Sequence, residues 1–324
     1  MRHRAPTRRT ALKAMLAAAV LTASLTAGCT RHGTSDDGRA PHSSQTPDGR
    51  HTAGAGSVLA VKIDNTAAAR PQTGLDSADV VYAEQVEGGL SRLMAVYATR
   101  LPEVVGPVRS ARESDLELLR QFDRPTLAFS GAQRKLLPLI DQAPLRPETP
   151  DAASGAYYRG SDKQAPHNLY LRPAKLMARA PGEAALTTGF RYGAAPAGGT
   201  VTATRTVRYP AARFTFTWSA DEKRWLVSMD GTPARTTAGK RVAAATVVVQ
   251  HVRIRTSRYH DVLGNYTPFT ETVGSGKAEV LRNGRSFEAT WTRQEATGGT
   301  TFTGADGGPV DFADGPVWVV FAKA

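Results

Sequence analysis

The chain has 324 residues, a single cysteine and a formal net charge of +12 at neutral pH. One cysteine excludes an intrachain disulfide and a cysteine-rich metal site. Five of the positive charges lie in the first 28 residues, which hold no acid, so the rest of the chain is less basic than the total suggests. The remaining charges form no runs, which argues against nucleic acid as a partner and leaves a weak attraction to anionic polymers.

The first 28 residues have the pattern of a bacterial signal peptide. Thr7–Lys13 resembles the twin-arginine motif imperfectly, so a twin-arginine-like route and the general secretory route both stay open. The apolar stretch Ala14–Gly28 is too short to span a bilayer. Leu25–Cys29 is similar to a lipobox, which predicts lipidation of Cys29 and anchoring at the outer face of the cytoplasmic membrane. An ordinary signal peptide with a chance cysteine is the alternative.

The remainder predicts a tether and two domains. Residues 29–56 are rich in Ser, Thr, Gly and Asp and should form a disordered tether. Strand patterns alternate with helical spacing over residues 57–190, and strand patterns dominate over residues 200–324. We therefore expect an α+β chain, with an N-terminal mixed α/β domain followed by a smaller β-rich antiparallel C-terminal domain. The alternating aromatic residues at 214–218 predict one side of a sheet core rather than a sugar-binding face.

Within the sequence, residues 78–122 have the highest concentration of glycines, carboxylates and arginines beside predicted core elements. Two apolar strands, 80–86 and 90–99, flank Glu87-Gly88-Gly89, which favours a hairpin. Ser110 and Glu113 have the spacing of a capping box that begins a helix. A helix N-terminus favours anions, so arginines next to it suggest an anion site.

Several motifs in this region are shared with a known family. The motifs are Ala69–Leu75, Ala78–Tyr82, Glu87–Arg92, Gly106–Arg112, Lys163–Asn168, Phe287–Trp291 and Gly315–Trp318. On these residues the chain resembles the YerB-like bacterial lipoproteins, a domain of unknown function (3048). The resemblance covers roughly residue 58 to the C-terminus. It implies an N-terminal α/β domain and a smaller β-rich C-terminal domain on a lipid anchor, and it brings no catalytic residues.

The candidate ligand-binding residues are those whose side chains suit a phosphate or carboxylate. They are Arg92, Arg109, Arg112, His167 and Asn168. The alternative is that Arg109 and Arg112 pair internally with carboxylates such as Glu87 and stiffen the domain.

Catalysis stays open. Glu87, Asp115 and His167 are the candidate acid–base residues, because glycoside cleavage needs paired carboxylates and His167 lies in a polar loop. His260-Asp261 fits a surface turn or a second site, and we favour the turn. Common serine-nucleophile, zinc and phosphate-loop motifs are absent from the sequence, and we expect no metal and no cofactor.

These observations predict a cell-surface lipoprotein that binds an anionic ligand or cell-wall polymer through its N-terminal domain. The alternative is a hydrolase acting on a cell-wall glycan or phosphodiester. The expected partners are the membrane, through the lipid on Cys29, and an anionic wall polymer. A purely structural partner of another envelope protein is a third reading, for which the sequence offers no positive feature.

Overall fold

The computed structural model describes residues 56–261 and 264–324. The predicted signal peptide 1–28, the lipobox cysteine Cys29 and the tether 29–56, apart from its last residue, lie outside the described residues. The described residues belong to one compact unit.

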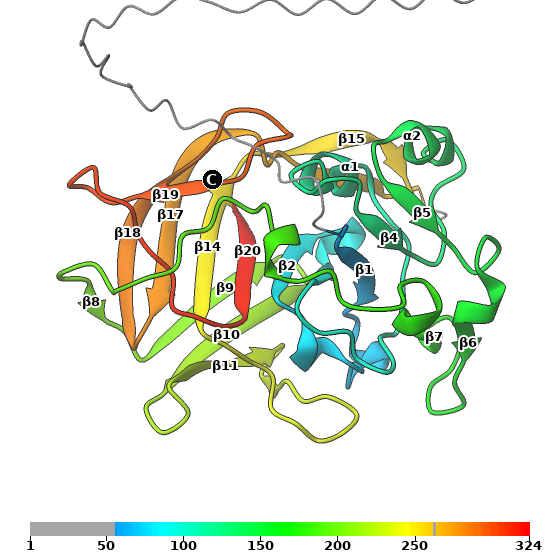
Figure 1. Cartoon of the computed structure of the whole chain (residues 1–324), viewed down its shortest axis with the longest axis horizontal. Helices are drawn as coiled ribbons and strands as arrows, with labels where there is room; N and C mark the ends of the chain where they lie inside the picture. The colour runs from blue at the N-terminus through cyan, green and yellow to red at the C-terminus, as the bar shows by residue number, and fades with distance from the viewer. Residues whose placement is uncertain (1–55, 262–263) are drawn as a thin grey trace, which may run out of the picture. The chain divides into compact units, whose positions relative to one another are not determined.

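The centre of this unit is an 11-stranded sheet with the order β19-β18-β17-β14-β20-β2-β3-β1-β4-β5, in which β8 pairs with β18. Its strands are β1 (Leu59–Asp64), β2 (Val80–Gln85), β3 (Ser91–Tyr97), β4 (Thr126–Ala128), β5 (Arg146–Glu148), β8 (Thr200–Val201), β14 (Thr246–Val252), β17 (Gly274–Arg282), β18 (Arg285–Arg293), β19 (Thr301–Thr303) and β20 (Val317–Lys323). Figure 1 shows the last strand, β20, between β14 and β2. The last strand therefore connects β2, from the N-terminal half of the chain, to β14, from the C-terminal half.

The strand directions support the expected antiparallel C-terminal domain only in part, because β14–β17, β17–β18 and β18–β19 are antiparallel but β20 joins the sheet in parallel. β20 pairs in parallel with both β14 and β2, and β4 pairs in parallel with β1 and β5. The sheet is mixed because a strand from the chain end is inserted between two earlier strands, a connection that a pattern of local hairpins does not reveal. The division into domains 57–190 and 200–324 stays a prediction, and strands from both ranges share the sheet.

Helix is sparse, so the fold is mostly β and the expected mixed α/β N-terminal domain is supported only in part. The α-helices of the described residues are α1 (Glu113–Leu119) and α2 (Leu137–Gln142). Short 3₁₀ turns make up the rest, η1 (Ala67–Ala69), η2 (Leu75–Ser77), η3 (Glu87–Gly89), η4 (Ser154–Ala156), η5 (Pro173–Lys175) and η6 (Glu183–Ala185). The predicted hairpin at Glu87-Gly88-Gly89 is confirmed, because β2 and β3 are antiparallel on either side of η3.

A second sheet covers one face of the first. It contains β9 (Thr204–Tyr209), β10 (Ala212–Ser219), β11 (Arg224–Met229), β12 (Thr232–Pro233) and β13 (Ala243–Ala244). Phe214 and Phe216 of β10 are buried and lie against Trp318 of the main sheet. The aromatic stripe is thus core, as its alternation predicts.

The two faces of the main sheet have separate cores. Odd-numbered residues of β1 such as Val61 and Ile63 pack toward the second sheet, whereas Ala60 packs on the face that carries Leu118 and Leu119 of α1. Because successive strand side chains point to opposite faces, Lys62 and Asp64 follow Ala60 onto the α1 face.

Two small ribbons complete the unit. The first is β6 (Tyr157–Arg159) with β7 (Leu169–Leu171), and the second is β15 (Ile254–His260) with β16 (Tyr266–Thr270). β16 packs against β2, η3 and α1. This ribbon therefore brings the C-terminal half of the chain against residues 78–122 (Figure 1).

Candidate functional site

Charged side chains form one row across three strands of the main sheet. Asp64 of β1 lies opposite Arg92 of β3, and Arg92 lies opposite Glu84 of β2. Residues directly opposite each other on neighbouring strands share a face. The row therefore lies on the α1 face, at the end of the sheet where β1 and β2 finish.

One end of this row is sealed by α1. The side chain of Lys62 is 0% exposed and forms ion pairs with Glu84 and Asp115, whose side chains are 1% and 0% exposed. Its Nζ lies 2.7 Å from Asp115 Oδ1. Burial lowers the pKa of Lys62 to about 8, although Asp115 favours the charged form. Asp115 is thus held in the interior, where no substrate reaches it.

The start of α1 differs from the predicted capping box. The N-cap is Arg112, not Ser110, and the backbone N–H of Arg112 donates to Asp115 Oδ2 at 2.7 Å. The helix is only seven residues long, and its first turn carries Glu113 and Asp115. These two acids oppose an anion at this N-terminus, so the helix-terminus argument for an anion site fails. The acid that accepts the N-cap backbone N–H is therefore Asp115 and not Glu113. Lys62 holds the carboxylate of Asp115 in this position.

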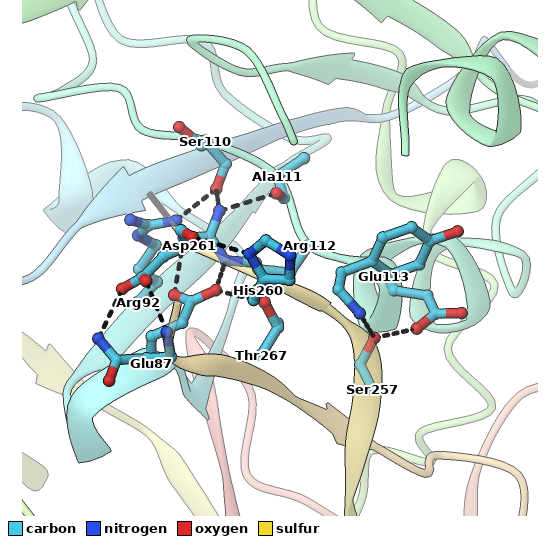
Figure 2. Close-up of polar contacts among 12 residues, drawn as sticks. Glu87, Arg92, Ser110, Ala111, Arg112, Glu113, Ser257, His260, Asp261 and Thr267 are labelled. Carbon is cyan, nitrogen blue, oxygen red and sulfur yellow. Dashed lines mark hydrogen bonds and ion pairs between the residues drawn. The ribbon is translucent and has the colours of Figure 1, made fainter. Parts of the chain in front are cut away.

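Arg112 makes most of its contacts within the protein. Its Nε lies 2.6 Å from Glu87 Oε1 and its Nη2 donates to Glu87 Oε2 at 2.7 Å. Its Nη1 donates to the carbonyls of Ser110 and Ala111. Thr267 of β16 also donates to Glu87, as Figure 2 shows. Here the internal-pairing alternative describes the geometry, and Glu87 ties the hairpin η3 to both Arg112 and the β15–β16 ribbon.

Glu87 remains ionised as a result. Burial alone would raise the pKa of Glu87, but the hydrogen bonds from Arg112 and Thr267 and the charge of Arg112 together hold it below its ordinary value. A carboxyl with a lowered pKa is a poor general acid near neutral pH.

Arg92 and Arg109 have donors to spare. Arg92 Nη1 donates to the carbonyl of Ser110 at 2.9 Å, and no ion pair joins Arg92 to a carboxylate within 56–261 and 264–324. Burial and the charges of Arg112 and Arg109 together lower the pKa of Arg92 to about 9, although Glu87 and Asp64 favour the charged form. Arg109 Nε lies 3.1 Å from Asp64 Oδ2, and its side chain is 25% exposed.

Asp64 joins Arg109 to the predicted histidine. Its Oδ2 lies 2.8 Å from His167 Nδ1, and its Oδ1 accepts the backbone N–H of Thr66 at 3.1 Å. Asp64 is 1% exposed and His167 is 22% exposed. Burial would raise the pKa of Asp64, but the hydrogen bonds from Thr66 and His167 and the charge of Arg109 hold it low. His167 therefore presents its Nε2 away from a fixed, ionised carboxylate.

Asn168 has a different role from its neighbour. Its side chain accepts a hydrogen bond from Arg159 at 2.8 Å and donates to the carbonyl of Gly160 at 2.8 Å. It is buried between these two partners. Asn168 thus closes the loop that positions His167 and does not face the charged row.

The open end of the row is a cavity of about 630 Å³. Its walls include four of the predicted residues, Glu87, Arg92, Arg109 and Arg112. His167 does not line the cavity and contacts two residues that do, Asp64 and Thr66. Asp115 and Asn168 do not line it either. Opposite the arginines, the ribbon contributes Tyr259, His260, Asp261 and Thr267. Ser257 fixes the ribbon to α1 by donating to Glu113 Oε2 at 2.6 Å.

Three of these wall residues escaped sequence reasoning. Asp64 follows an apolar strand and precedes Asn65, which is also the pattern of an ordinary turn. His260 was interpreted as part of a surface turn, and nothing in the sequence relates it to residues 78–122. Thr267 carries no signal, because a threonine on a strand is common.

The described segments hold neither a candidate metal cluster nor a membrane-spanning helix. Residues 56–261 and 264–324 contain no group of three or more His, Cys, Asp or Glu side chains that could hold a metal ion. Within the same ranges, no helix has the length and hydropathy needed to cross a membrane.

Comparisons with known proteins agree with the resemblance. The chain matches "Protein of unknown function (DUF3048) N-terminal domain" over residues 45–186 and the corresponding C-terminal domain over residues 205–319. It is 34% identical over 112 residues to "Putative lipoprotein YerB" of Bacillus subtilis (strain 168), which covers 35% of this chain and 34% of that protein. The matched segment thus spans about a third of that relative.

A solved structure extends the likeness. The crystal structure of the YerB protein from Bacillus subtilis matches with a TM-score of 0.70 at 21% identity, covering 83% of this chain and 91% of that chain. At this identity the likeness concerns the fold alone. The two matched domains confirm the predicted family: the chain belongs to the DUF3048 family.

Proposed function

We propose that the protein is a lipid-anchored surface protein whose cavity binds an anionic group through Arg92 and Arg109. The observation that carries the proposal is the set of guanidinium donors that the described residues leave unused in the cavity. Arg112 is excluded from this role because Glu87 and two backbone carbonyls occupy its donors. The lipobox-like Cys29 and the lipoprotein relative support the anchor.

The electrostatics favour an anion at Arg92 in particular. Desolvation without a paired carboxylate leaves its charged form poorly stabilised, which is why its pKa falls. A phosphate or carboxylate beside Arg92 would supply the missing countercharge. Hydrogen bonds to charged groups contribute about 1.5–3 kcal/mol, and they are stronger where water is excluded.

Asp64 positions Arg109 for the same anion. It binds Nε and leaves both terminal nitrogens of Arg109 without a partner among the described residues. A guanidinium oriented from its Nε side can offer its remaining edge to a ligand in bidentate fashion. The cavity volume of about 630 Å³ lies within the roughly 300–1,000 Å³ of small-molecule sites, so it accommodates one repeat or end group of a wall polymer.

Retention on isolated cell wall tests the function. We expect Arg109→Gln to release the full-length protein at lower salt than wild type, and Arg92→Lys to do the same because Lys cannot reproduce the planar donor set. Arg235→Gln is the matched control, since Arg235 is exposed and does not line the cavity. Unchanged retention of both cavity variants, with unfolding curves like wild type, would reject the proposal.

A hydrolase is the second candidate, and one geometry favours it. Asp64 holds His167 Nδ1 at 2.8 Å, which orients Nε2 to accept a proton from water. Neither predicted carboxyl group acts as the general acid of such a hydrolase. Glu87 is ionised, and Asp115 is buried beneath α1. Labelled wall fragments should then release product with wild type and not with His167→Asn. No product from wild type at any pH removes this candidate.

A further inference from the structure

A second cavity lies next to the first and has a different charge. Its volume is about 530 Å³, and its walls come from the ends of β2, β9 and β20 and from the β15–β16 ribbon. Three of its lining residues are basic, Arg208, Arg255 and Lys323, and none is acidic. The first cavity, by contrast, mixes three arginines with four acidic residues, Asp64, Glu87, Glu113 and Asp261.

The two cavities share a thin wall. Thr267 of β16 lines both, and its hydroxyl bonds Glu87 on the side of the first cavity. On β2, Gln85 lines the second cavity while the next two residues, Val86 and Glu87, line the first. Neighbouring strands lie about 4.8 Å apart. The separation between the cavities is therefore about one strand, which an extended polymer can cross.

Two of the three cations in the second cavity lack a countercharge. Arg255 is neutralised, since its Nε lies 3.0 Å from Glu271 Oε1. Arg208 and Lys323 are exposed, and the described part of the chain offers neither an ion pair. Arg208 also lies directly opposite Arg213 across β9 and β10. Like charges in this position repel, so the surface gains from a bound anion.

We infer that the ligand is a linear chain of phosphate groups, with one phosphate at Arg92 and Arg109 and the following ones at Arg208 and Lys323. The inference rests on the proposed function and specifies its ligand class. Both arginine and lysine bind phosphate well, whereas planar carboxylates favour arginine. A linear chain of phosphates can neutralise Arg208 and Lys323 in the second cavity while it is bound at Arg92 and Arg109. A single small anion bound at Arg92 and Arg109 cannot reach them.

The test compares probes of different length on the full-length protein. Calorimetric titrations use orthophosphate, linear polyphosphate of about 15 units and poly-glutamate of the same length. We expect polyphosphate to bind at least tenfold more tightly than orthophosphate, with a steeper loss of affinity in salt, because each added ionic contact contributes a salt-dependent increment. In Arg208→Ala/Lys323→Ala, the affinity for polyphosphate should fall to that for orthophosphate.

The control is Arg235→Ala/Lys175→Ala, which removes the same charge from exposed sites that line neither cavity. This control should keep the gain with chain length, and thermal unfolding checks that both double variants are folded. An equal gain in Arg208→Ala/Lys323→Ala, no gain with length in wild type, or equally tight poly-glutamate would each overturn the inference. Orthophosphate binding that depends on Arg109 would still stand in those cases, whereas its absence would reject the proposed function itself.

Discussion

Two groups of charges lie on the same face of the main sheet and differ in what covers them. Lys62, Glu84 and Asp115 are sealed beneath α1, whereas Asp64, Arg92 and Arg109 border a cavity. On β1 only one residue separates Lys62 from Asp64. The sealed group satisfies its charges internally, while the open group leaves guanidinium donors unused. The comparison indicates that similar residues stabilise the fold at one end of the row and are free for a ligand at the other.

The largest expected effect comes from breaking the sealed group. Lys62→Met leaves Glu84 and Asp115 buried without their shared cation. Removing one partner of a buried ion pair destabilises proteins by about 3–5 kcal/mol. Urea unfolding should report a loss of this size.

The matched control removes one charge of each sign. Lys62→Met/Asp115→Asn leaves Glu84 opposite Arg92, so the double variant should lose less stability than Lys62→Met alone. An equal or greater loss would show that hydrogen bonding by Asp115, not charge balance, stabilises this region.

Glu87→Gln tests the boundary between the two groups. The change removes the negative charge that pairs with Arg112 and one of its two acceptor oxygens, and it should reduce stability by about 1.5–3 kcal/mol. It also leaves the charge of Arg112 uncompensated, so phosphate should bind more tightly than to wild type. Titration of phosphate measures this, with the exposed Glu103→Gln as control. Weaker phosphate binding would contradict the view that Glu87 competes with the ligand.

Acid should weaken the open group. The folded-state pKa values of Asp64 and Glu87 lie below their ordinary values of 3.8 and 4.5. The unfolded chain therefore takes up these protons first, and the stability that they contribute is present above about pH 4.5 and lost as the pH falls through the folded-state values. The midpoint of urea unfolding should fall from pH 6 to pH 3.5, and less steeply in Glu87→Gln. Parallel slopes for the two proteins would argue against a lowered pKa of Glu87.

The smallest effect concerns the ribbon. Thr267→Val removes one hydrogen bond to Glu87 and should reduce stability by about 0.5–1.5 kcal/mol. Thr217→Val, at an exposed position of β10, controls for the strand propensity of valine. If the two variants unfold alike, Thr267 does not tie the ribbon to the hairpin.

The local parts of this architecture are visible in the sequence. The hairpin at Glu87-Gly88-Gly89 and the buried aromatic residues of β10 follow from turn chemistry and alternation, which are properties of neighbouring residues. The insertion of β20 between β14 and β2 is not predictable in this way, because it depends on pairing between the two ends of the chain. Glu87, Arg92, Arg109 and Arg112 lie within one short stretch of sequence, and all four line the cavity.

Burial and distant contacts explain what the sequence left open. Asp115 lies in the first turn of α1, where an acid is usually exposed, but here it is buried in an ion pair with Lys62 of β1. The partner of His167 is Asp64, which lies 103 positions earlier in the chain. His260 and Thr267 enter the site only because β16 packs on β2 and η3. In each case a single side chain's role is set by an element that sequence spacing does not connect to it.

The central claim is that Arg92 and Arg109, and not Arg112, receive an anion. Calorimetric titration of orthophosphate into wild type, Arg109→Gln and Glu87→Gln tests it most directly. We predict at least tenfold weaker binding in Arg109→Gln, corresponding to the loss of about 1.5–3 kcal/mol, and binding at least as tight as wild type in Glu87→Gln. Equal affinity of wild type and Arg109→Gln, or no heat of binding in wild type, would contradict the account.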